Sequence, residues 1–189
     1  EFGPRALGNR SIIADPRDEM MQKNLNLKIK FRESFRPFAP VILRKDLNSW
    51  FNLNCDSPYM LLVDKVREHK RIRLKNKNCF GIDLLYQKRS TIPAVTHVDF
   101  SARIQTVHSK TNQFFHELLV AFKKKTRCPI LVNTSFNIRG EPIVESPQDA
   151  VKCFLGTNLD VLCIGNFILL KEDQNSAKLI SYKDEFDLD

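Results

Sequence analysis

The sequence lacks several patterns by which membrane proteins and nucleotide-binding enzymes are commonly recognised. No apolar run approaches the roughly 20 residues that a membrane-spanning helix needs, so no membrane is expected as a partner. There is no Gly-x-Gly-x-x-Gly fingerprint and no P-loop signature, which argues against the common dinucleotide and P-loop folds. The chain starts at Glu1 with neither an initiator Met nor a signal peptide, and we expect a fragment of a longer protein.

The sequence lacks the cysteine spacing of a metal or disulfide site. The five cysteines are an odd number, and no two form a Cys-x-x-Cys pair. Cys128, Cys153 and Cys163 lie in apolar runs and are expected to be buried thiols. The histidines show no metal-ligand spacing either, so no metal site is predicted. A reducing, cytoplasmic location is expected.

The net charge of +8 is concentrated in one segment. Nine Lys or Arg side chains lie between Lys65 and Arg89, against the two acids Glu68 and Asp83. We interpret residues 65–89 as a solvated basic insertion. The alternative is a nucleic-acid patch, but Phe80 and Tyr86 are the only aromatic residues there, which makes base stacking a weak case.

The remaining pattern predicts an α/β domain with a mixed sheet over residues 15–171, after a junction at 1–14 and before a polar tail at 172–189. Asp15-Pro16 has the form of a helix start, with a helix to about Asn26. Helices are also predicted at 112–125 and from Ser146 to about 155. Strands are predicted at 38–43, 59–66, 92–98, 103–107 and 129–132, with a hairpin formed by 161–164 and 167–170.

Lys30, Arg32 and Arg36 form the first candidate site. Arg binds phosphate oxygens in a planar fork and Lys binds them as a point charge. If the first helix continues, Arg32 and Arg36 share a face. If the segment is extended, Lys30 and Arg32 share one instead. The plain alternative is a solvated basic surface run.

The run Asn133-Thr134-Ser135-Phe136-Asn137-Ile138-Arg139 forms the second candidate site. It follows an apolar strand, and strand ends are where α/β proteins place ligands. Ser135 and Asn137 offer a hydroxyl and an amide, and Arg139 offers charge. A turn held by local side-chain hydrogen bonds is the alternative.

His97, Asp99 and Arg103 lie between two predicted strands. His97 could donate a proton near neutral pH, and Asp99 could orient it or bind Mg²⁺. Arg5 and Arg10 lie in the junction and could reach a phosphate or bind a neighbouring domain. No Ser-His-Asp arrangement is arguable, so no covalent serine intermediate is expected.

Five motifs carry a resemblance to a known family, in the right order. They are Glu1 to Ser11, Phe35 to Pro40, Thr96 to Asp99, Ala102 to Val107 and Asn133 to Pro142. Over about residues 1–171 the sequence resembles the C-terminal, YrdC-like domain of O-carbamoyltransferases of the nodulation-protein and antibiotic-tailoring type. Lys-x-Arg and Ser-x-Asn are also the signature pairs of YrdC-like proteins. The resemblance implies a twisted mixed sheet with flanking helices around a nucleotide site.

The resemblance also implies a function. Such enzymes use carbamoyl phosphate and ATP with Mg²⁺ to form carbamoyl adenylate, and pass the carbamoyl group to a hydroxyl acceptor in a separate N-terminal, actin/sugar-kinase-like domain. The expected catalytic residues are Lys30, Arg32, Ser135, Asn137 and His97. The expected ligand-binding residues are Arg103, Arg36, Asn133, Arg139, Arg5 and Arg10.

Two rival functions stay open. One is a YrdC-type enzyme that makes threonylcarbamoyl adenylate for tRNA modification, against which the Arg5 to Ser11 and Thr96 to Val107 motifs argue. The other is a non-catalytic RNA-binding module built on residues 65–89, which a salt-dependent gel shift would reveal.

Overall fold

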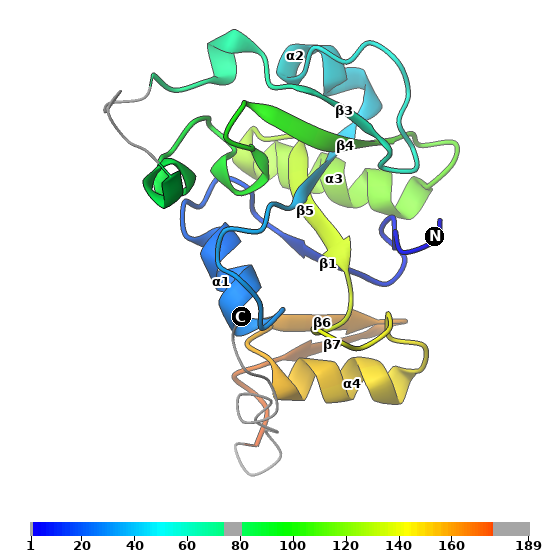
Figure 1. Ribbon diagram of the computed structural model, residues 1–189. Helices are drawn as coiled ribbons and strands as arrows, with labels where there is room; N and C mark the ends of the chain where they lie inside the picture. Colours follow the sequence, from blue (N-terminus) through cyan, green and yellow to red (C-terminus); the bar gives the residue numbers. More distant parts are fainter. Residues whose placement is uncertain (1, 74–80, 176–189) are drawn as a thin grey trace. The chain divides into compact units, whose positions relative to one another are not determined.

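The computed structural model describes residues 2–73 and 81–175, and these divide into two compact units (Figure 1). The first unit comprises Glu1–Gln22 and Pro37–Ser135. The second comprises Lys23–Arg36 and Phe136–Asp189. The predictions for the end of the polar tail at 176–189, and for Cys79 and Phe80, lie outside the described residues.

The first unit is built on a five-stranded mixed sheet in the order β1-β5-β2-β4-β3. The strands are β1 (Ser11–Ala14), β2 (Ala39–Leu43), β3 (Leu62–Lys65), β4 (Ser101–Val107) and β5 (Ile130–Ser135). β2 and β4 run parallel, and the other neighbours are antiparallel. The sheet confirms the expected mixed α/β class, and the likeness to YrdC proteins stays a prediction.

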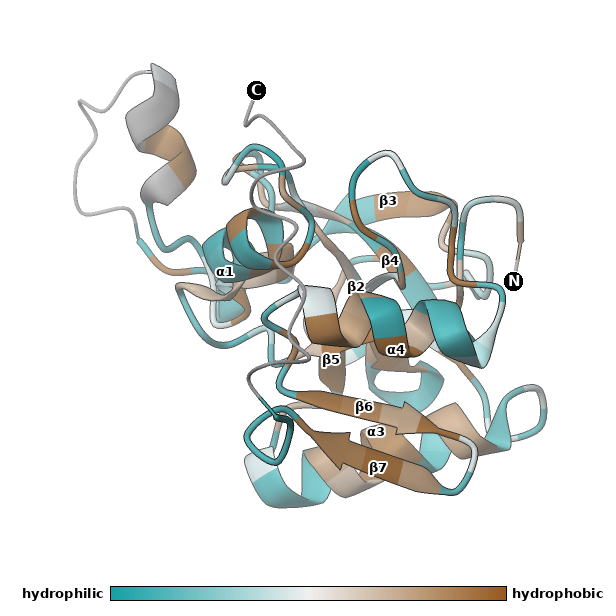
Figure 2. Cartoon of the chain, turned by 90° about the horizontal axis from the view of Figure 1, so that it is seen from below, coloured by the Kyte–Doolittle hydropathy of each residue, from teal (hydrophilic) through white to brown (hydrophobic). Residues whose placement is uncertain are grey.

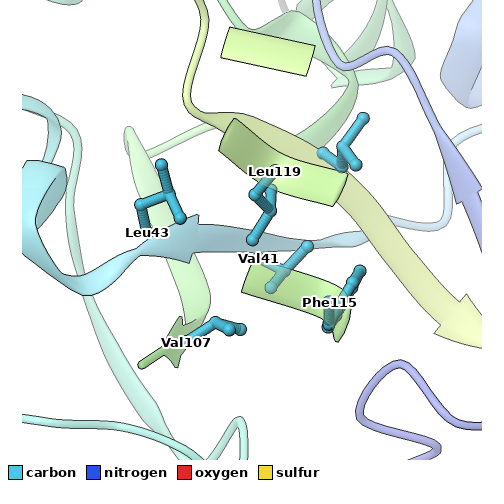
Figure 3. Packing of buried hydrophobic residues seen from close by; sticks show 6 residues of the cluster. Val41, Leu43, Val107, Phe115 and Leu119 are labelled. Carbon is cyan, nitrogen blue, oxygen red and sulfur yellow. The ribbon is translucent and has the colours of Figure 1, made fainter. Parts of the chain in front are cut away.

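The core of the first unit lies between this sheet and helix α3 (Gln113–Thr126), which covers one face of it (Figure 1). All five residues of β2 are buried. One cluster joins strand side chains to two residues of α3: Val41, Leu43, Val107, Leu131, Phe115 and Leu119. Figure 3 labels five of them, all but Leu131. The helix prediction at 112–125 is confirmed, with Asn112 as N-cap accepting from the backbone N of Phe115 at 3.1 Å.

Short helical turns connect the strands of the first unit. They are η1 (Arg44–Asp46), α2 (Leu47–Trp50), η2 (Glu68–Lys70), η3 (Gly81–Tyr86) and η4 (Pro93–Val95). The strand predicted at 92–98 is therefore wrong, because Pro93 opens a 3₁₀ turn there. The hydroxyl of Thr96 donates to the carbonyl of Ile92 at 2.9 Å and closes that turn.

The ends of the basic segment are built into the first unit. The backbone N of Ile72 donates to the carbonyl of Arg89 at 2.7 Å, which ties the two ends together. Lys70 Nζ lies 4.1 Å from the ring centroid of Trp50, and the Arg71 guanidinium lies 4.9 Å from that of Phe100. These cations are therefore occupied in packing, which weakens the nucleic-acid alternative.

The second unit combines α1 (Met21–Lys28), of which all but the first two residues belong to it, with α4 (Pro147–Gly156) and the hairpin of β6 (Val161–Ile164) and β7 (Phe167–Leu170). The hairpin is confirmed residue for residue, and both strands are brown in Figure 2. Ser146 and Asp149 form a reciprocal capping box that starts α4, as the sequence predicts.

The predicted start of the first helix at Asp15 is wrong, although a helix is present in the second half of the predicted range. The Asp15 carboxylate accepts from the backbone N of Arg17 at 3.0 Å and also binds its guanidinium, which closes a local turn. The helix begins only at Met21. Among the described residues, no helix is both long enough and apolar enough to span a bilayer.

Candidate functional site

In the second unit, Lys30 and Asn137 meet although 107 residues separate them. Lys30 is 4% exposed, and its Nζ donates to the backbone carbonyl of Asn137 at 2.8 Å and to Asn137 Oδ1 at 2.7 Å. The amide nitrogen of Asn137 donates to the carbonyl of Glu141 at 2.8 Å. The Lys-x-Arg and Ser-x-Asn motifs therefore contribute side chains to one hydrogen-bonded cluster.

Burial, together with the charge of the neighbouring Arg32, lowers the pKa of Lys30 to about 7. An ammonium group at this position can therefore gain or lose its proton near neutral pH. Burial, with Arg36 adding to it, lowers the pKa of Arg32 to about 10. The guanidinium of Arg32 stays charged near neutrality.

Asn26 fixes the chain that carries Arg32, and sequence reasoning missed it. Asn26 is fully buried at the end of α1. Its Oδ1 accepts from Arg32 Nε at 2.7 Å, and its Nδ2 donates to the carbonyls of Ser34 at 3.1 Å and Arg36 at 2.8 Å. An Asn between two leucines in a helix is the available signal, because Asn is unfavourable there unless its side chain bonds to backbone.

Neither local geometry weighed for the basic run is correct. α1 ends at Lys28, so Arg32 and Arg36 do not share a helical face. Phe31 has a left-handed φ of 46°, so the segment is not extended either. Arg36 is exposed and lies 3.5 Å from the Glu33 carboxylate. Arg139 is half-buried in the same unit.

In the first unit, three arginines have a buried guanidinium nitrogen. Arg5 Nε, Arg103 Nε and Arg89 Nη2 have no hydrogen-bond partner among the described residues. Burial lowers the pKa of Arg103, and the nearby charge of Arg5 lowers it further. Burial likewise lowers the pKa of Arg89. Donors buried without acceptors are costly, so these three residues, the arginine cluster, are suited to an anionic ligand.

Arg89 was not predicted as a site residue, because it lies in the segment interpreted as a surface insertion. It is only 5% exposed, whereas a solvated insertion would leave it open to water. The pairing of its carbonyl with the backbone N of Ile72 holds it in place. The basic composition of the segment hides this residue, and no local pattern separates it from its exposed neighbours.

His97 lies beside this cluster in a tight turn. The backbone N of His97 donates to the carbonyl of Ser101 at 2.9 Å, and Asp99 accepts from the backbone N of Ser101 at 3.0 Å. Burial lowers the pKa of His97. The charge of Asp99 raises this pKa, and the charges of Arg103 and Arg89 lower it. The hydrogen bonds from Ser101 lower the pKa of Asp99. The imidazole is therefore neutral at neutral pH.

Asn133 is buried in the sheet, at 1% exposure. Its Nδ2 donates to Gln105 Oε1 at 2.6 Å, and Gln105 Nε2 donates to the carbonyl of Leu7 at 3.1 Å. Its Oδ1 has no partner among the described residues. β5 continues to Ser135, which pairs with Ser11 of β1 and is half-buried at the end of the strand.

The junction is anchored on the sheet by its glycine as well as by Gln105. Gly8 has φ of +101°, and a Cβ there would lie 2.3 Å from the ring of Phe115. Its backbone N donates to Ser11 Oγ at 2.9 Å. This close approach sets the position of the neighbouring Arg5. Arg10 is half-buried on the same junction.

The thiol predictions are partly wrong. Cys128 and Cys153 are buried, and burial raises the pKa of each to about 11. Cys163 is exposed, because it lies on the outer side of the β6–β7 hairpin. In the part of the chain that the structure describes, no three His, Cys, Asp or Glu side chains gather as metal ligands would.

Comparison with known proteins gives a consistent result. The family described as carbamoyltransferase C-terminus matches residues 1–171. An uncharacterized Synechocystis protein is 53% identical over all of this chain and 31% of its own length. The nodulation protein NolNO of Sinorhizobium fredii is 47% identical over 90% of this chain and 23% of its own length.

A 3'-hydroxymethylcephem-O-carbamoyltransferase of Amycolatopsis lactamdurans is 40% identical over 80% of this chain and 25% of its own length. The chain thus spans less than a third of the length of these relatives. The family match at residues 1–171 covers almost the whole described structure, and the chain belongs to the carbamoyltransferase C-terminal family.

Proposed function

We propose that this chain is the carbamoyl-activating part of an O-carbamoyltransferase, which binds carbamoyl phosphate and ATP and forms carbamoyl adenylate. Relatives named as O-carbamoyltransferases support the general class. The observation that carries the proposal is the arginine cluster. Each of its three arginines has one buried guanidinium nitrogen without a partner among the described residues, which fits a ligand that brings several anionic oxygens.

Arg103 and Arg5 bind phosphate oxygens in this proposal, and Arg89 adds a third guanidinium. Burial lowers the pKa of His97, so its imidazole is suited to take up a proton close to these charges. In this proposal the arginines bind the anion, and His97 takes part in proton transfer.

The cluster of the second unit has a complementary role. Lys30 and Arg32 stabilise charge on a phosphoryl group, and Asn137 orients the carbamoyl group. Asn137 suits this role because Lys30 and Glu141 fix both ends of its side-chain amide. Oriented donors that need no rearrangement are what stabilises charge developing in a transition state.

The reaction balances with one water molecule. Water cleaves carbamoyl phosphate to phosphate and carbamate. A carbamate oxygen then attacks the α-phosphorus of ATP, forming an O–P bond while the bond to the leaving pyrophosphate breaks. The chain's residues hold the charges and exclude bulk water from the mixed anhydride.

ATP is a substrate in this proposal, and Mg²⁺ arrives with its triphosphate. The residues present fit the phosphate groups: the described donors are guanidinium and ammonium groups, which repel a bare cation. Mg²⁺ would supply charge neutralisation on the triphosphate. The acceptor hydroxyl and its activation belong to a separate N-terminal, actin/sugar-kinase-like portion, whose length the relatives leave room for.

The test is pyrophosphate release from ATP, Mg²⁺ and carbamoyl phosphate by the chain and by the full-length protein. We expect slow release by the chain alone and none from the double variant Ser135→Ala/Asn137→Ala. Release that depends on threonine and bicarbonate would instead identify a threonylcarbamoyl-adenylate synthase. Transfer of a carbamoyl group to an added alcohol by the chain alone would contradict the division of labour.

A further inference from the structure

The edge of the sheet in the first unit carries an apolar surface. Exposed side chains lie along β3 and the loop before it, and we call them the β3 patch: Phe2, Tyr59, Leu61, Leu62 and Val63. Their exposed fractions lie between 40% and 58%. The ring of Phe2 lies 5.0 Å from that of Tyr59, so the junction is part of the patch. The apolar part of β3 is brown in Figure 2.

An edge strand with exposed apolar side chains is commonly covered by another part of the protein. In the described residues β4 is the one strand that pairs with β3, while the backbone N of Asn52 donates to the carbonyl of Lys65 at 2.9 Å on the other side. The Lys65 end of this edge is therefore already covered, and the edge that invites a partner is its Leu62–Val63 end. Leu62 and Val63 point to opposite faces of the sheet, and both are exposed. Soluble proteins commonly protect such edges with charges, prolines or bulges. Here the apolar residues precede the charged pair Asp64-Lys65.

We propose that the β3 patch is the surface on which the N-terminal portion of the full-length protein docks. The match is to the C-terminus of the family, and the relatives have more than two thirds of their length outside the matched region. That portion joins this chain on the side of Phe2. Phe2 and Arg5 exchange backbone hydrogen bonds of 2.9 and 3.0 Å, which fix Phe2 within the patch. The connecting chain therefore arrives at the uncovered strand.

The pairing of β3 with β4 places the proposed docking surface next to the arginine cluster. Val63 lies directly opposite Arg103 of β4, and neighbours across a ladder share a face of the sheet. A portion packed on Val63 lies next to the guanidinium of Arg103. Docking thereby shields the arginine cluster from water. This inference rests on family membership and on the patch, and it holds whichever reaction the site performs.

The test compares amide hydrogen exchange of residues 59–65 in this chain and in the full-length protein. We expect exchange at Leu62 and Val63 to be at least tenfold slower in the full-length protein, at every protein concentration. Equal exchange in both proteins would overturn the proposal. So would protection of this chain alone that grows with its concentration, because a second copy would then be the occupant.

Variants separate docking from folding. Val63→Asp in the full-length protein should abolish the extra protection, and so should Leu61→Asp, which lies outside the strand and cannot break the ladder. Phe114→Asp is the matched control, because Phe114 is an apolar side chain that is 81% exposed and lies on α3, not in the β3 patch. Retained protection in both patch variants, or loss in the control, would contradict the assignment. Sulfate binding by the variants reports on the arginine cluster separately.

Discussion

The two cationic clusters of this protein satisfy their donors in opposite ways. In the second unit, Lys30 and Arg32 donate to Asn137 and Asn26, so protein oxygens hold the charges. In the first unit, each residue of the arginine cluster keeps a buried nitrogen without a partner among the described residues. The donors of the former are satisfied within the protein, whereas those of the latter would gain acceptors from the anion that we propose as ligand.

The largest expected effect tests the rigidity of the second cluster. Asn26→Ala leaves the carbonyls of Ser34 and Arg36 and the Nε of Arg32 without their partner. We expect the free energy of unfolding to fall by about 3 kcal/mol. Urea unfolding measures it, with Asn24→Ala on the same helix as control. A loss as small as that of the control would show that this network contributes little.

A second prediction concerns how the junction holds the first cluster. Gly8→Ala forces a Cβ against the Phe115 ring and should destabilise the chain by about 2 kcal/mol. Gly165→Ala is the control, since its φ is +56° and nothing lies within 4 Å of a Cβ there. If thermal unfolding shows the two variants to be equal, left-handed backbone alone would explain the cost, and the packing on Phe115 would not matter.

A third prediction uses the absence of acceptors around Arg103. Arg103→Ala should weaken sulfate or ATP binding by about 1.5 kcal/mol, or roughly tenfold, because one charge-assisted contact is lost. The same variant should unfold at an equal or higher temperature, since it removes a buried donor without a partner among the described residues. Calorimetric titration and thermal melts check both. Loss of stability with unchanged binding would reverse the interpretation of the cluster.

The smallest effect is the pH dependence at Lys30, whose folded-state pKa is about 7 against an ordinary 10.5. Between these values the unfolded chain binds more protons, so the free energy of unfolding should rise with pH. Binding of an anion needs the ammonium form, so sulfate affinity should fall above pH 7, by at most about tenfold per pH unit, or 1.4 kcal/mol.

Lys30→Met is the control for both slopes. This variant keeps the length of the buried side chain and removes the titrating group. If urea unfolding and sulfate titrations between pH 7 and 9 give the same slopes for Lys30→Met and the parent, Lys30 is not the group responsible.

The elements that could be predicted from the sequence are those with local chemistry. Gly165-Asn166 sets the hairpin turn, and the Ser146–Asp149 capping box sets the start of α4. Asp15-Pro16 carries the same kind of signal, but the Asp15 carboxylate is taken by Arg17. A signal of this kind therefore predicts an element only where no nearby side chain competes for it.

The sequence was enough to predict several residues of the candidate site, but not the residues that they contact. Lys30 and Asn137 belong to recognisable motifs, and the structure joins them. Asn26 and Arg89 were not predicted as site residues. Both are singled out by their burial, and burial depends on contacts between segments that are distant in the sequence. The Cys163 prediction failed for a related reason, since an apolar hairpin can expose one face.

The link from Asn133 through Gln105 to Leu7 has an evolutionary consequence. Gln105 donates to the backbone carbonyl of Leu7, so the residue at position 7 can be replaced by another without loss of this hydrogen bond. Gln105 and Asn133 have no such freedom, because each supplies a side-chain group that the other needs. Lineages that replace one amide should therefore replace the other as well, and the two positions should change as a pair.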